Sequence, residues 1–160
     1  MPKVLSLSET FRIAEGIERN GYQFYTQAAA GTKKKKVKQV MQELAEKEKL
    51  HEKTFSEWRQ KYTGPADEPL YDPDGQAQAY LQAVSDTHVF NLSEDVGQRL
   101  ASVQTPESML RLAIHFEKDT IVFFTALKKT VKGEKQKKVD LLIQEEFSHI
   151  RQLQEVLKTL

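Results

Sequence analysis

The chain has 160 residues and no cysteine, and its 24 lysines and arginines nearly balance its 23 aspartates and glutamates. The small net charge of +1 gives no argument for binding nucleic acid or an anionic membrane. The missing cysteines exclude disulfides, thiolate metal sites and cysteine nucleophiles within these residues. The longest apolar run, Ile121–Phe124, is too short to span a bilayer, and the N-terminus lacks the apolar core of a signal peptide. We therefore expect one cytoplasmic domain over residues 1–160.

The first third of the chain predicts a helical hairpin over about residues 6–62. Ser6 and Glu9 have the spacing of a capping box, and Gly31 ends the first helical pattern. The second pattern covers about residues 34–61 in heptad steps. The two expected stripes are Phe11, Ala14, Glu18, Gly21, Tyr25 and Ala28, and then Val37, Met41, Leu44, Glu48, His51, Phe55, Trp58 and Tyr62.

The middle of the chain, about residues 63–104, predicts a long crossover. It contains Gly64-Pro65 and the turn sequence Asp72-Pro73-Asp74-Gly75. The remaining pattern favours one or two short helices, at about residues 74–85 and 93–102. This segment is long enough to run the length of a helical bundle.

The last third predicts a second hairpin over about residues 105–160. Thr105-Pro106 is a good N-cap followed by proline at the first helical position, and Gly133 separates two helical patterns. The stripes are Leu110, Ala113, Glu117, Thr120, Phe124, Leu127 and Val131, and then Val139, Leu142, Glu146, His149, Leu153, Val156 and Leu160.

The two hairpins also resemble each other in sequence. Residues 11–19 align with 110–118, and residues 44–51 align with 142–149. Duplicated helical hairpins joined by one long crossover are what a ferritin-like bundle requires. The sequence therefore predicts an all-α, ferritin-like four-helix bundle.

Each expected long helix carries a glutamate in its apolar stripe, and two of them carry Glu-x-x-His. The six residues are Glu18, Glu48, His51, Glu117, Glu146 and His149. Residues three apart share a helix face, so each Glu-x-x-His pair can hold one ion. We expect both hairpin turns to lie at the same end of the bundle, which places all six residues roughly 20–28 Å from that end, in one layer.

Charge indicates what this layer holds. Four buried carboxylates without partners would each cost several kcal/mol, and two neutral imidazoles cannot compensate them. Two divalent cations can, and oxygen and nitrogen donors suit iron or manganese. A single glutamate in a stripe is more often a solvated position, and one Glu-x-x-His is common in helices. Two such pairs and two further glutamates in duplicated order favour a dimetal site.

These motifs resemble the rubrerythrin-like branch of the ferritin-like di-iron carboxylate superfamily over nearly the whole chain. The matching segments are residues 18–25, 44–51, 117–124 and 145–149. The resemblance implies two iron ions per chain, with manganese or zinc as substitutes. It also implies that Glu18, Glu48 and His51 hold one iron and Glu117, Glu146 and His149 the other, with Glu48 and Glu146 bridging.

The chain also departs from that family. Full-length rubrerythrins add a rubredoxin domain, so we expect this chain to use an external electron-transfer protein such as a rubredoxin-type donor. Rubrerythrins carry a further glutamate where this chain has Thr120, which puts a strong preference for peroxide in doubt. Tyr25 is expected beside the site, where it would hydrogen-bond a ligand carboxylate or donate an electron, or else pack as ordinary core. Its counterpart Phe124 has no hydroxyl group and can neither hydrogen-bond a carboxylate nor donate an electron.

The function that we expect is that of a di-iron oxidoreductase, peroxidase- or ferroxidase-like, that oxidises Fe(II) with peroxide or dioxygen and acts in oxidative stress. The alternatives are iron binding or storage and a non-catalytic, metal-stabilised bundle. Apolar residues of the crossover, among them Tyr80, Leu81, Val89 and Phe90, and the family resemblance favour a homodimer. No partnership with nucleic acid or membranes is expected.

Overall fold

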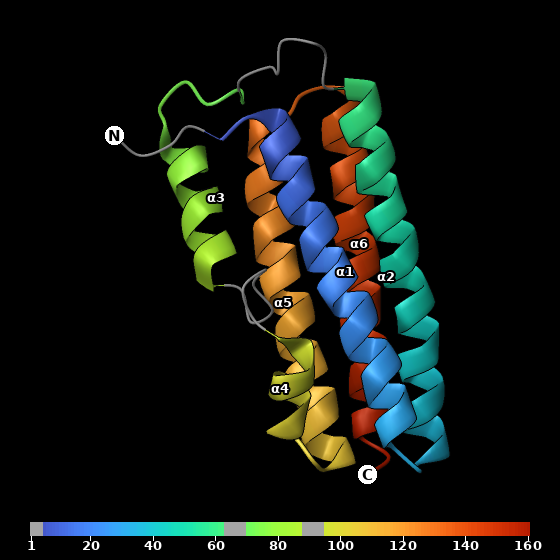
Figure 1. Ribbon diagram of the computed structural model, residues 1–160. Helices are drawn as coiled ribbons and strands as arrows, with labels where there is room; N and C mark the ends of the chain where they lie inside the picture. Colours follow the sequence, from blue (N-terminus) through green and yellow to red (C-terminus); the bar gives the residue numbers. More distant parts are fainter. Residues whose placement is uncertain (1–4, 63–69, 88–94) are drawn as a thin grey trace.

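The computed structural model describes residues 5–62, 70–87 and 95–160. Within these ranges the chain forms six helices: α1 (Leu7–Gly31), α2 (Lys35–Tyr62), α3 (Gln76–Thr87), α4 (Val96–Ala101), α5 (Pro106–Thr130) and α6 (Glu134–Leu157). The long helices α1, α2, α5 and α6 form a bundle, and the short helices pack outside it, α3 against α5 and α4 against α1 (Figure 1). The predicted all-α four-helix bundle is confirmed.

The ends of the long helices follow local chemistry. Ser6 and Glu9 form the expected capping box at the start of α1. Thr105 caps α5, where it accepts a hydrogen bond from the Ser108 amide. α5 ends at Thr130, three residues before the glycine expected to stop it. Gly133 has a φ of 63°, a conformation that favours glycine, and it begins α6 instead.

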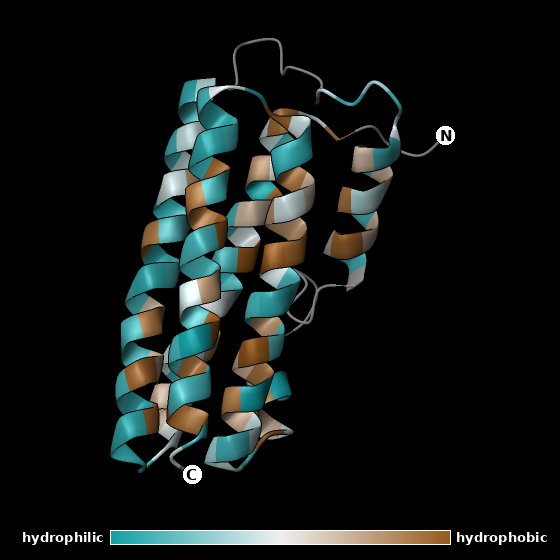
Figure 2. Cartoon of the chain, turned by 180° about the vertical axis from the view of Figure 1, so that it is seen from behind, coloured by the Kyte–Doolittle hydropathy of each residue, from teal (hydrophilic) through white to brown (hydrophobic). Residues whose placement is uncertain are grey.

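The core is a column of apolar side chains between the long helices. Its largest members include Phe11, Phe55 and Phe124, all fully buried, with Trp58 at the edge. Phe55 packs against Trp58 at 5.3 Å and against Phe124 at 5.2 Å between ring centroids, which joins the two hairpins. Figure 2 shows hydrophilic residues over the outward faces of the long helices and hydrophobic residues recurring between them.

The two hairpin turns lie at opposite ends of the bundle, so the expectation that they share an end is wrong (Figure 1). Lys138 Nζ, near the start of α6, lies 3.1 Å from the hydroxyl of Tyr62, the last residue of α2. The Tyr71 amide donates to the carbonyl of Thr130 at the end of α5. The turns lie at opposite ends because the crossover returns the chain along the bundle before α5 begins.

The six expected site residues still share one layer, because each lies near the middle of its helix. Glu18 is the twelfth residue of the 25-residue α1, and Glu117 is the twelfth of the 25-residue α5. Glu48 and Glu146 are the fourteenth of 28 and the thirteenth of 24 in α2 and α6. A position at mid-helix has the same depth from either end, so reversing one hairpin leaves the layer intact.

The crossover is only partly described. Leu81 is fully buried against the bundle, whereas Tyr80 is 47% exposed. Val89 and Phe90, on which the expectation of a homodimer partly rests, lie outside the described residues. None of the described helices is both long and apolar enough to cross a membrane.

Candidate metal centre

The structure brings all six predicted site residues together at the centre of the bundle. Each long helix contributes at least one of them, because each helix turns its apolar stripe, and the acidic residue within it, inward. The four glutamates, Glu18, Glu48, Glu117 and Glu146, are fully buried, and His51 and His149 are 3% and 2% exposed. Six polar side chains therefore occupy a region that water does not reach.

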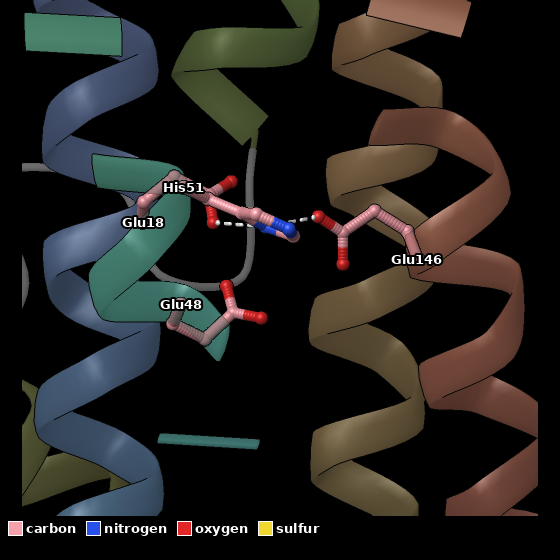
Figure 3. A group of neighbouring side chains, drawn as sticks. All are labelled: Glu18, Glu48, His51 and Glu146. Atoms are coloured by element: carbon pink, nitrogen blue, oxygen red, sulfur yellow. Dashed lines mark hydrogen bonds and ion pairs between the residues drawn. The ribbon is translucent and has the colours of Figure 1, made fainter. Parts of the chain in front are cut away.

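His51 lies between glutamates from both hairpins (Figure 3). Its Nδ1 is 3.2 Å from Glu18 Oε2 on α1 and 2.9 Å from Glu146 Oε1 on α6. Glu48, on the same helix as His51, also points toward this space (Figure 3). One imidazole nitrogen and three carboxylates thus face a common point.

His149 has matching surroundings on the other side of the layer. Its Nδ1 is 2.9 Å from Glu146 Oε2, 3.3 Å from Glu48 Oε1 and 3.3 Å from Glu117 Oε1. The two imidazole rings stack with their centroids 5.7 Å apart. The duplication in the sequence therefore appears as a duplication of the site.

Two sets of donor atoms overlap in this layer, and in each set the atoms lie within 4.8 Å of one another. The first set is Glu18, Glu48, His51 and Glu146, and the second is Glu48, Glu117, Glu146 and His149. Glu48 and Glu146 belong to both. This is the arrangement in which these two carboxylates would bridge a pair of ions.

Burial governs the protonation of the layer when only protons balance its charge. Burial and the charge of Glu18 raise the pKa of Glu48 well above its usual range, and burial and the charge of Glu146 do the same for the pKa of Glu117. Burial also opposes the ionisation of Glu146, but His149 and His51 outweigh it and lower the pKa of this carboxyl.

The imidazoles respond in the opposite sense. Burial disfavours the His149 cation, but the neighbouring carboxylates of Glu117, Glu146 and Glu48 outweigh burial and raise its pKa to about 12. The pKa of His51 is raised in the same way by Glu145, Glu146 and Glu18. Protons on the two histidines and on some carboxylates thus take the place of the positive charge that the layer needs.

Protons leave much of the layer unsatisfied. Seven of its atoms are buried without a hydrogen-bond partner, although several lie near an imidazole nitrogen without good alignment. They are Glu18 Oε1, both oxygens of Glu48 and of Glu146, Glu117 Oε2 and His149 Nδ1. Buried polar atoms are otherwise almost always bonded. Carboxylate oxygens and imidazole nitrogens suit a divalent transition metal, so this donor set fits a pair of such ions.

Aromatic side chains line the layer. The Tyr25 hydroxyl donates to Glu117 Oε1 at 2.5 Å, and the Phe116 ring packs edge-on against Tyr25. A Cβ atom added at Gly21 would lie 2.5 Å from Phe116 Cζ and 3.0 Å from Glu48 Oε2. Gly21 therefore allows Phe116 and Glu48 to approach the backbone of α1.

Tyr25, Thr120 and the remaining two histidines lie outside the six-residue set. Tyr25 is fully buried beside the layer. Thr120 is buried one turn after Glu117 on α5. His115 is exposed and takes no part in the layer. His88 lies outside the described residues.

Glu145 is a member of the site that the sequence pattern did not identify. Its Oε2 lies 2.7 Å from His51 Nε2, although its side chain is 51% exposed. The stripe of inward-facing residues does not include it, because it lies about 100° around α6 from Glu146. The only signal was its place directly before a candidate ligand.

Comparisons with known proteins agree with this description. The model of the Rubrerythrin family matches residues 3–59, most of the first hairpin. A solved structure from Thermotoga maritima, provisionally assigned as a ferritin-like diiron-carboxylate protein, is 23% identical, with a TM-score of 0.74. The alignment covers 99% of this chain and 98% of that one. No curated protein matches. The expected rubrerythrin-like resemblance and the ferritin-like fold are thus confirmed.

Proposed function

We propose that this ferritin-like bundle is a rubrerythrin-like di-iron oxidoreductase that oxidises Fe(II) with peroxide or dioxygen. The observation that carries the proposal is the pair of overlapping donor sets, which share Glu48 and Glu146 and are fully buried. A structural site for one ion needs neither the second set nor two shared carboxylates. Four carboxylates balance the charge of two divalent ions.

The proposed ligands divide as the sequence led us to expect. Glu18 and His51 would hold one iron, Glu117 and His149 would hold the other, and Glu48 and Glu146 would bridge them. When bound, a ferrous pair supplies two electrons, which with two protons reduce one molecule of hydrogen peroxide to two of water.

The side chains around the site have roles of their own. Tyr25 holds one oxygen of Glu117 through its hydroxyl and so fixes the direction of that carboxylate. Phe116 packs on the Tyr25 ring and shields this side of the layer from water. Such a dry, preorganised setting strengthens electrostatic interactions within it.

Two further parts of the proposal concern partners. With no cysteine in its 160 residues, the chain would receive electrons from a separate electron-transfer protein, such as a rubredoxin-type donor. We also propose that the chain works as a homodimer in the cytoplasm and acts in oxidative stress. Thr120 stands where rubrerythrins have a further glutamate, so the reaction with peroxide would be less strongly favoured over that with dioxygen.

Anaerobic iron loading followed by stopped-flow absorbance tests the proposal. The protein should bind two Fe(II) per chain, and its absorbance should change on mixing with either hydrogen peroxide or dioxygen. The diferric product should persist after one cycle until a reduced electron-transfer protein is added. The double substitution Glu48→Gln with Glu146→Gln should abolish both binding and reaction, whereas Glu155→Gln, an exposed glutamate of α6, should change neither.

The same preparation distinguishes the other two functions. A diferrous protein that reacts with neither oxidant would favour a metal-stabilised bundle. Light scattering that shows a large shell, with more than two irons retained per chain, would favour iron storage. One iron per chain or none would contradict the dimetal centre itself.

A further inference from the structure

Glu145 contacts His51 from the side opposite to the proposed ion. Its Oε2 is 2.7 Å from His51 Nε2, while His51 Nδ1 faces Glu18 and Glu146. The contact joins α6 to α2, and therefore one hairpin to the other. The Glu145 side chain is 51% exposed and that of His51 only 4%, so Glu145 links a buried ring to the surface.

We propose that Glu145 is a positioning residue that fixes the orientation and tautomer of His51. A neutral imidazole carries its proton on one nitrogen and a lone pair on the other. A carboxylate at Nε2 keeps the proton there, which leaves the Nδ1 lone pair directed at the ion. This proposal rests on the metal centre proposed above.

The two halves of the site differ at this position. In the alignment of residues 44–51 with 142–149, the residue equivalent to Glu145 is Lys47. An ammonium group only donates hydrogen bonds, so it cannot accept the proton of an imidazole N–H. Among the described residues, the carboxylates that contact His149, those of Glu48, Glu117 and Glu146, face its Nδ1, where the other ion would bind.

It follows that the two metal positions are not equivalent. Glu145 supports the histidine of one position, whereas the aligned residue for the other position is Lys47. Residues that orient a metal-binding histidine typically contribute 10–100-fold to metal affinity. The position at His51 therefore binds its ion more tightly, and the centre fills in order, His51 first and His149 second.

A simpler role for Glu145 makes a different prediction. A half-exposed carboxylate can merely form an ion pair with a protonated histidine in the metal-free protein. Pairs of this exposure typically contribute little to stability and would not distinguish between two metal positions. The experiment must therefore report on each position separately.

Zinc suits this experiment because it is diamagnetic. Zinc affinities of the wild type, Glu145→Ala and Glu145→Gln would be measured by competition with a chelator. ¹⁵N spectra of the histidine rings in the zinc-loaded proteins would report the tautomer of His51 and His149 separately. Glu155→Ala removes an exposed glutamate from the same helix and serves as the control.

We expect Glu145→Ala to weaken the binding of one of the two zinc ions by about 10–100-fold and to change the ring signals of His51 alone. Glu145→Gln keeps an acceptor oxygen and should lie between Glu145→Ala and the wild type. Equal weakening of both ions, or no weakening, in proteins that bind two zinc ions would overturn the role of Glu145. A wild type that binds no zinc would instead overturn the metal centre, and this proposal with it.

Discussion

The hairpin α1–α2 and the hairpin α5–α6 supply the same kinds of metal-binding side chain, yet their surroundings differ. Three of the aligned pairs that differ are Gly21 and Thr120, Tyr25 and Phe124, and Lys47 and Glu145. The first hairpin provides a tyrosine that reaches across to Glu117. The second provides a glutamate that reaches across to His51. Each hairpin therefore completes the site of the other.

This difference shows which constraints the centre imposes. A ligand must present a lone pair at one point, and the charges of all ligands must balance those of the ions, so ligand type is narrowly restricted. A neighbour must fill volume and bond whatever polar group faces it, and several residue types meet that need. Two halves with the same ligands can thus differ in residues around them.

Removing the carboxylates that both donor sets share should have the largest effect, because it removes ligands from both metal positions at once. The double substitution Glu48→Leu with Glu146→Leu should abolish metal binding, as measured by elemental analysis. The helical fold should survive, and the protein can become more heat-stable, because leucine packs where a buried charge was costly. Circular dichroism at increasing temperature measures this. A double variant that does not fold even at low temperature would contradict the account.

Removing the metal should have the next largest effect, and it should depend on pH. At a free metal concentration 1,000 times the dissociation constant, binding stabilises the fold by about 4 kcal/mol, so chelation should lower the Tm. Binding also requires Glu48, Glu117 and His149 to lose protons, and the pKa of each is raised in the metal-free fold.

The direction of the pH dependence follows from these raised pKa values. Groups with raised pKa stabilise the metal-free fold fully below their unfolded pKa, about 4.3 for glutamate and 6.5 for histidine, and lose this contribution as the pH rises toward the folded value. Metal binding becomes stronger over the same range. The difference in Tm between loaded and metal-free protein should therefore widen from about pH 5 to 8. A difference that narrows would show that these groups do not release protons to the metal.

Gly21 tests whether the two hairpins also differ in how closely side chains pack against the backbone, because its counterpart is the larger Thr120. The substitution Gly21→Ala places a methyl group 2.5 Å from Phe116 Cζ and 3.0 Å from Glu48 Oε2. Such overpacking costs about 1–3 kcal/mol, which exceeds the gain of up to about 1 kcal/mol from helix propensity. Thermal unfolding should show a lower Tm.

Gly31→Ala is the matched control, since the added Cβ there meets Met109 Cε at an ordinary 3.8 Å. This variant should unfold at the same temperature as the wild type or higher. If both alanine variants behave alike, the close approach of Phe116 to α1 is not a constraint.

The smallest expected effect is that of the hydroxyl group that distinguishes Tyr25 from Phe124. Tyr25→Phe removes the buried hydroxyl that donates to Glu117 Oε1, which should cost about 1–2 kcal/mol in denaturant unfolding of the metal-free protein. Tyr80→Phe removes a hydroxyl from a ring that is 47% exposed and should cost nothing measurable. A cost for Tyr25→Phe no larger than that control would show that the bond to Glu117 is energetically neutral.

The sequence by itself determined the helices and the composition of the site. Heptad steps place Glu48 and His51 on the face that carries Phe55, and the same holds around Glu146 and His149, so these polar residues had to be buried. Once buried, four carboxylates need compensating positive charge, an argument that depends on charge alone. The fold class and the six inward-facing residues therefore followed from spacing and composition.

Only the tertiary structure decided how the two hairpins face each other. Periodicity describes one helix at a time and is the same in either chain direction, so it cannot tell whether the two turns share an end. The contact of Glu145 with His51 joins residues 94 positions apart, from different hairpins, and depends on that arrangement. The same is true of Tyr25 and Glu117, 92 positions apart. The candidate ligands could be predicted from the sequence because each follows the periodicity of its own helix. Tyr25 and Glu145 could not be placed in this way, because each contacts a residue that lies across the bundle.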